Sequence, residues 1–148
     1  MHFNAPFIKM QKIYLLILGS FIFLGCSDES KVVLPTKEYK NIEWSSADKA
    51  KNIALKHLSR NEYSSSHLIR IKESEKPHYH DTHNLTVTVL EGDSIIHFKE
   101  HKVLLHKGDV VYIPKGTYHW AENIDSEASV VFATFSPAFN GKDKRLVD

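Results

Sequence analysis

From residue 66 onward, apolar and polar residues alternate along short segments, and this pattern constrains the fold more than any other feature of the chain. Gly, Pro, Asn, Asp or charged residues typical of turns separate the segments. Because successive side chains of a β-strand point to opposite faces, each segment is expected to be a strand with one buried face. Many short strands at close spacing predict a mostly β protein, built as a β-sandwich or barrel. The predicted strands are Ser66–Ile71, Leu85–Leu90, Ser94–Phe98, Lys102–Leu105, Val110–Ile113, His119–Glu122 and Ala128–Phe135.

The segment before these strands has a different period. Ser45 offers a helix N-cap, with an acidic residue, Asp48, three positions later. Apolar positions then recur at the spacing of one helix face, at Ala50, Ile53, Ala54, His57 and Leu58. We therefore expect a helical segment over residues 41–62, packed against a single β-barrel domain over residues 63–148.

The first residues are typical of a targeting sequence. Lys9 and Lys12 precede an apolar run, Ile13–Leu24, which is too short for a permanent membrane span. Its length suits the core of a secretory signal. Met10 is an alternative start, because Met10 to Gly25 alone would make a complete short signal.

The apolar run ends at the only cysteine of the chain. The order Phe23-Leu24-Gly25-Cys26-Ser27 resembles the lipobox of bacterial lipoproteins, although Leu is usual where Phe23 stands. The resemblance implies a lipoprotein signal peptide over residues 1–25 and acylation of Cys26, which would become the mature N-terminus. An ordinary signal peptide followed by an incidental cysteine is the alternative.

Residues 26–40 are largely polar and predict a tether between a lipid anchor and the folded domain. The lipobox resemblance implies a location in the cell envelope, with the membrane as a partner through the anchor. Ser27 is not the aspartate that retains such lipoproteins on an inner membrane. In an organism with two membranes, we therefore expect the outer membrane, with the domain facing the periplasm or the cell surface.

Charge and cysteine content exclude several classes of function. With 19 Lys and Arg against 18 Asp and Glu, the net charge is +1, so the chain lacks the positive field that a nucleic-acid partner requires. A single cysteine rules out an internal disulfide and any zinc site built from several thiolates. Histidine is abundant instead, with 10 in the chain.

Three of the histidines are candidates for a metal site. His78 and His80 are two residues apart, so both imidazoles would share one face of an extended segment. His119 begins a later predicted strand, directly after a turn that contains Pro114 and Gly116. Imidazoles that converge in this way could bind one divalent ion, although a lone strand histidine is more often solvated or packed.

Two stretches resemble the signature motifs of the cupin superfamily of small β-barrels. Pro77-His78-Tyr79-His80, followed by Gly92, resembles the first motif. The second motif is matched at Gly108, Pro114, Gly116, His119 and Asn123. The resemblance implies a single cupin jelly-roll barrel in which His78, His80 and His119 hold a divalent metal ion.

The first motif departs from the family pattern at one position. The family places a glutamate ligand seven residues before the motif glycine, and that position is Leu85 here. His83 could serve as a substitute fourth ligand if its segment bulges. Alternatively, His83 orders the loop or, with Asp81, supports a ligand imidazole.

The resemblance leaves two classes of function open. The first is a metal-dependent oxygenase, isomerase or lyase acting on a small molecule. That molecule is expected to be anionic, because three neutral histidines leave a divalent ion its full charge. The second is a non-catalytic lipoprotein that binds a small ligand or a metal, and a homodimer is compatible with either. Histidine ligands suit Fe, Mn, Ni, Cu or Zn, so the sequence does not select the metal.

Overall fold

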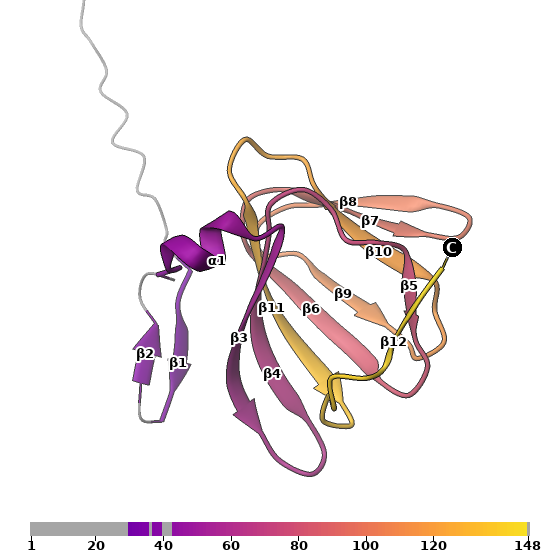
Figure 1. The fold of residues 1–148 in the computed structure, drawn as a ribbon, viewed down its shortest axis with the longest axis horizontal. Helices are drawn as coiled ribbons and strands as arrows, with labels where there is room; N and C mark the ends of the chain where they lie inside the picture. Colours follow the sequence, from indigo (N-terminus) through magenta and orange to yellow (C-terminus); the bar gives the residue numbers. More distant parts are fainter. Residues whose placement is uncertain (1–29, 36, 40–42, 148) are drawn as a thin grey trace, which may run out of the picture.

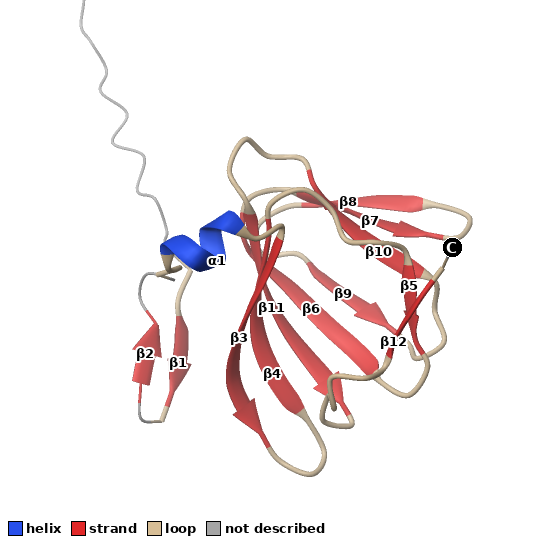
Figure 2. Cartoon of the chain, in the orientation of Figure 1, coloured by secondary structure: helices blue, strands red, loops and turns tan. Residues whose placement is uncertain are grey.

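The computed structural model describes residues 30–35, 37–39 and 43–147. Within these residues, two five-stranded antiparallel sheets face each other, with a two-stranded hairpin and one short helix at the side of the first (Figures 1 and 2). The first sheet has the strand order β3-β4-β11-β6-β9 and the second the order β12-β5-β10-β7-β8. The elements are β1 (Val32–Leu34), β2 (Lys37–Tyr39), α1 (Ser46–Ala50), β3 (Ile53–Arg60), β4 (Ser65–Ile71), β5 (His78–His80), β6 (Asn84–Glu91), β7 (Ser94–Phe98), β8 (Lys102–Leu105), β9 (Val110–Ile113), β10 (His119–Asn123), β11 (Ser129–Ser136) and β12 (Lys144–Leu146).

The main core lies between the two sheets, which confirms the predicted mostly β, jelly-roll fold. Alternate residues of the central strand β11 point into this core, among them Val131, Ala133 and Phe135. Ile96 of β7 faces them from the second sheet. The alternation visible in the sequence therefore marks the buried face of each sheet.

A second cluster of buried side chains covers the outer face of the first sheet. Trp44, Ala54, Leu68 and Val130 form it, and Val32 of β1 packs against it. Because this cluster covers part of the outer face of the sheet, the described residues that contribute to it from before β4 belong to the folded domain.

The glycine of the first motif is required by the turn between β6 and β7. Gly92 has a φ of +72°, a conformation that L side chains rarely adopt. A Cβ at this position would also lie 3.2 Å from the Cα of Ser129. Both the backbone conformation and the close approach of the first residue of β11 therefore favour glycine.

The prediction of a helical segment over residues 41–62 is wrong beyond residue 50. Ser45 caps α1 as expected, but the helix ends at Ala50 and β3 follows, paired along β4. Lys56 explains the error, because its ammonium group lies 5.1 Å from the ring of Trp44 and its stem is half-buried. Ala54, Lys56 and Leu58 are on the more buried face of β3, so a lysine stands where an apolar residue would have marked the strand.

The predicted tether also differs from the structure where residues 26–40 are described. β1 and β2 pair as a hairpin, and the hydroxyl of Ser30 donates a hydrogen bond of 3.0 Å to the carbonyl of Leu90. This part of the segment therefore docks on the barrel. The predicted signal peptide and Cys26 lie outside the described residues. Among the described helices, none has the length and apolar character needed to cross a membrane.

Candidate metal centre

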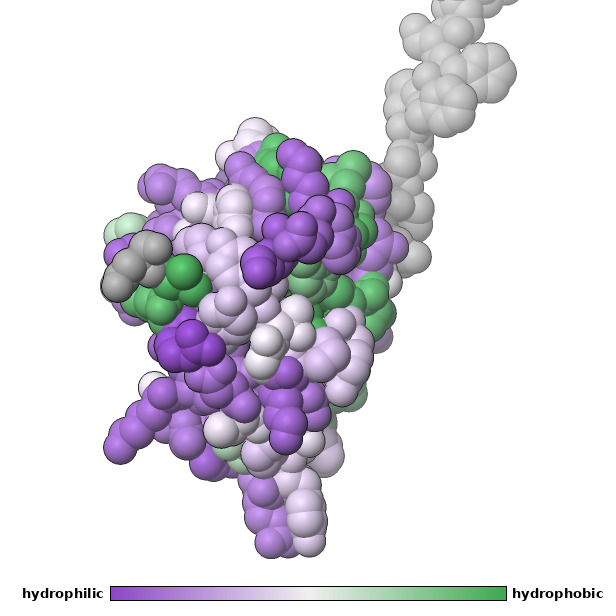
Figure 3. All heavy atoms as spheres, turned by 90° about the vertical axis from the view of Figure 1, so that its right-hand side faces the viewer, coloured by the Kyte–Doolittle hydropathy of each residue, from purple (hydrophilic) through white to green (hydrophobic). Residues whose placement is uncertain are grey.

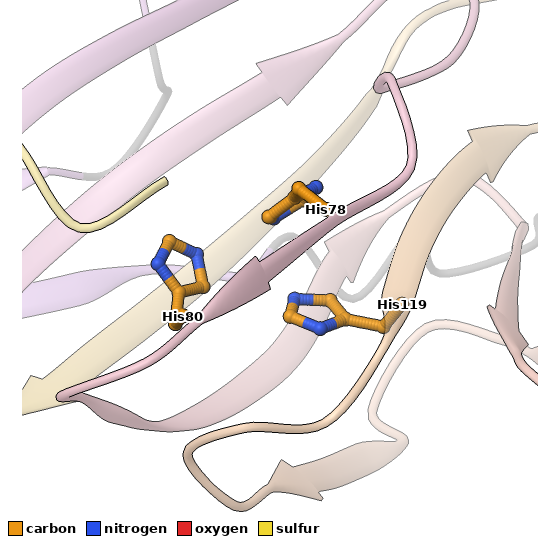
Figure 4. A group of neighbouring side chains, drawn as sticks. All are labelled: His78, His80 and His119. Carbon is orange, nitrogen blue, oxygen red and sulfur yellow. The ribbon is translucent and has the colours of Figure 1, made fainter. Parts of the chain in front are cut away.

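Two adjacent strands of the second sheet bring three histidines together inside the barrel (Figure 4). His78 and His80 lie on β5, and His119 begins β10, directly opposite His78 in the strand register. All three are at least 95% buried. One ligand atom from each ring lies within 4.8 Å of the others, a spacing that allows all three to contact one ion.

The turn before β10 places His119 against β5. Gly116 has a φ of +76°, which suits glycine, and its amide donates a hydrogen bond of 2.7 Å to the carbonyl of His80. The turn is closed by a hydrogen bond of 3.2 Å from the amide of Thr117 to the carbonyl of Pro114. These contacts explain why proline and glycine precede the third histidine.

Each imidazole uses the same nitrogen for support. The Nδ1 of His78 is 2.8 Å from the carbonyl of Lys76, that of His119 is 2.8 Å from the carbonyl of Thr117, and that of His80 is 2.9 Å from the carbonyl of Asp143. A carbonyl only accepts, so each Nδ1 carries the proton and each Nε2 keeps its lone pair. Metal-bound histidines typically have this arrangement, so the three residues fit a divalent ion.

Burial also keeps these rings uncharged. It lowers the pKa of His78 and of His80 to about 4, and it lowers the pKa of His119 below its usual value. The nearby carboxylate of Glu75 partly opposes the lowering of the pKa of His78, whereas the neighbouring His119 lowers the pKa of His80 further. At neutral pH all three rings are therefore available as neutral ligands.

The structure does not bring His83 into this group. Its Nδ1 forms a short hydrogen bond with the carboxylate of Asp143, and its Nε2 is 3.2 Å from the carbonyl of Ala138. Both nitrogens therefore contact groups outside the three-histidine cluster, and no ligand atom of His83 is part of that cluster. His83 orders the loop after β5. Its partner is Asp143, and Asp143, rather than Asp81, supports the imidazole of His80. Asp81 instead pairs with Arg145, with a contact of 2.7 Å.

Asp143 connects the C-terminal segment to the histidine site. Its carboxylate accepts hydrogen bonds from the backbone amides of Asp81, Thr82 and His83, and its own carbonyl holds His80. Burial alone would raise its pKa, but the hydrogen bonds from His83 and Thr82 lower the pKa of Asp143 to about 2. The carboxylate is therefore charged at neutral pH and anchors the loop that follows β5.

Replacing Asp143 with alanine is expected to lower the free energy of unfolding by about 3 kcal/mol, because it leaves a buried imidazole and three amides without their acceptor. The side chains of His83 and Asp143 are only 2% and 7% exposed. The matched control is Asp109→Ala, which breaks the exposed His106–Asp109 pair and should cost less than about 1 kcal/mol. Chemical denaturation of both variants measures the difference, and equal losses would contradict the buried pair.

A carboxylate that the sequence analysis missed lies beside the site. Glu75 precedes β5 and lines the same cavity as His78 and His119. Its Oε1 is 3.0 Å from the ammonium of Lys144, and its Oε2 accepts a hydrogen bond of 3.3 Å from the amide of Ala121. Burial alone would raise its pKa, but the charge of Lys144 and the neighbouring imidazoles hold the pKa of Glu75 below its usual range. Nothing in the local sequence marks this residue, because Lys144 reaches it through the pairing of β12 with β5.

The position at which the family has a glutamate ligand is occupied by Leu85, whose surroundings are apolar. Leu85 is 6% exposed and lines the cavity. The histidines open into this cavity, which side chains of both sheets line and which is partly open to solvent.

Comparisons with known proteins agree with this architecture. Residues 67–135 match the cupin domain family. An uncharacterised protein of Aquifex aeolicus (strain VF5) is 38% identical over 120 residues, which cover 79% of this chain and 98% of that protein.

Solved structures of low sequence identity share the fold. KdgF from Halomonas sp. is 23% identical with a TM-score of 0.57, over 60% of this chain and 82% of that one. Pac13 of Streptomyces, described as a nucleoside dehydratase, is 17% identical with a TM-score of 0.58, over 65% of this chain and 78% of that one. The two-motif pattern, the barrel with its inward histidines and these similarities agree, and the chain belongs to the cupin superfamily.

Proposed function

We propose that this protein is a membrane-anchored, metal-dependent cupin enzyme, an oxygenase, isomerase or lyase, that acts on a small anionic molecule. The observation that carries the proposal is the convergence of His78, His80 and His119, with ligand atoms within 4.8 Å of one another, on the wall of a cavity. Fe, Mn, Ni, Cu and Zn all suit such a set of ligands.

The charges around the site support an anionic substrate. A divalent ion bound there supplies a Lewis acid, and neutral histidines leave its charge undiminished for an anionic oxygen. Glu75 lines the same cavity, but its carboxylate is paired with Lys144 and its pKa is lowered, so it is a weak base and does not select among the three reaction classes. Pac13, a dehydratase, is an example of elimination chemistry on a similar fold.

Metal content tests the proposal directly. The full-length protein is stripped with a chelator and dialysed against each of the five metals, and the bound metal is then measured. We expect close to one equivalent per chain for at least one metal. If no metal binds in a stoichiometric amount, the proposed function is wrong.

The anchor is proposed from the lipobox alone. Cys26→Ser is expected to remove the acylation site, so the protein should leave the membrane fraction or accumulate unprocessed. Fractionation and mass spectrometry of both forms measure this. Recovery of the wild-type protein unacylated and outside the membrane fraction would contradict a lipid-anchored location in the cell envelope. Sucrose-gradient separation, in an organism with two membranes, tests the expected outer-membrane location.

A further inference from the structure

The lining of the cavity is polar only in a few places. Glu75 and the three histidines mark one end, and Ser94 is a further polar residue on the wall. Most of the remaining lining is aliphatic, contributed by residues of both sheets that include Val87, Val89, Ile96, Leu105, Val111, Ile113 and Val131. The face of the molecule shown in Figure 3 is by contrast largely hydrophilic. The lining of the cavity is therefore more apolar than this face of the molecule.

Ser94 lies far from the histidines along the same sheet. In the pairing of β7 with β10, His119 is opposite Phe98, and Ser94 is opposite Asn123, four residues further along. Four residues of a strand span about 13 Å. Ile96 and Ala121 form the pair between these positions, and both line the cavity. The two polar regions are therefore separated by an apolar stretch.

The hydroxyl of Ser94 is buried without a partner. Ser94 is 3% exposed, and its Oγ has no hydrogen-bond partner among the described residues. A buried hydroxyl without a partner costs folding free energy, and an aliphatic wall gains nothing from one. A hydrogen bond to a bound molecule would remove this cost.

We propose that the cavity binds a molecule with a largely apolar body, held by a carboxylate at the three histidines and by a second hydrogen-bonding group at Ser94. This inference rests on the proposed function, because the carboxylate needs the metal. A sugar or nucleoside fits the lining poorly, since its many hydroxyls would meet aliphatic side chains without partners. Uridine, which has been bound to Pac13 variants, thus belongs to a different ligand class.

Octanoate and its ω-hydroxy derivative are suitable probes, because they differ only in a terminal hydroxyl. Both are titrated by calorimetry into metal-loaded full-length protein, with the protein-free detergent buffer as the blank. We expect the ω-hydroxy probe to bind about three- to tenfold more tightly than octanoate, from one added hydrogen bond to a buried hydroxyl. Ser94→Ala should abolish this preference.

Ser129→Ala is the matched control, because Ser129 is also a buried serine with an unpartnered hydroxyl but does not line the cavity. This variant should keep the preference. If metal-loaded protein binds neither probe, or binds glucuronate more tightly than both, the proposed ligand class is wrong while the metal site stands. A preference that persists in Ser94→Ala overturns the role of Ser94. If the protein cannot be loaded with metal before the titration, that result counts instead against the proposed function.

Discussion

Replacing His119 with alanine is expected to weaken divalent-metal binding by at least about a hundredfold, because it removes one of three ligands. Metal titration of the stripped full-length protein measures the change. The barrel should still fold, since its core is built from apolar side chains on both sheets. Circular dichroism and thermal unfolding of the metal-free variant check this point.

The matched control for this variant is His97→Ala. His97 lies on the neighbouring strand β7, where its ring stacks on Trp120 at 3.6 Å and its Nε2 is 2.8 Å from the carboxylate of Glu122. It is not part of the three-histidine group. We expect this variant to bind metal as the wild type does. Equal losses in both variants, or full metal occupancy in His119→Ala, would contradict the assigned ligands.

The sequence was informative about the fold because the strands of the barrel are short and amphipathic. Predicted and observed bounds of β7, β8 and β9 agree, those of β4 differ by one residue at its start, and those of β11 differ by one residue at each end. The signal failed where the buried face of a strand carries a lysine or where a strand is exposed. In β3, Lys56 stands between Ala54 and Leu58 on the more buried face and lies over Trp44, and β12 is exposed at all three residues, so neither segment has the apolar pattern of a strand.

The candidate ligands were predictable for a different reason. His78 and His80 are two residues apart in the chain, and the turn before His119 has its own proline and glycine, so local patterns mark all three. Glu75 and Asp143 reach the site through tertiary contacts. Each depends on the C-terminal segment pairing with β5, which no local pattern of that segment predicts. The same pairing gives His83 its partner, which explains why the sequence left its role open.

The stability of the metal-free protein is expected to fall steeply as the pH drops from about 6.5 to about 4. In the folded state, burial lowers the pKa of both His78 and His80 to about 4, whereas in the unfolded chain both titrate near 6.5. Between these values the unfolded state binds more protons than the folded state, so acid favours unfolding. A shift of this size corresponds to about 3 kcal/mol for each histidine.

Denaturant titrations of stripped protein at a series of pH values measure this effect. His80→Gln should reduce the slope between pH 6.5 and 4 by close to one proton, because glutamine does not titrate. Below about pH 4 the histidines cause no further loss of stability. Protonation of Asp143, whose pKa in the folded state is about 2, then lowers the stability further. A flat stability profile between pH 6.5 and 4 would mean that the buried imidazoles are not held in the neutral form that metal binding requires.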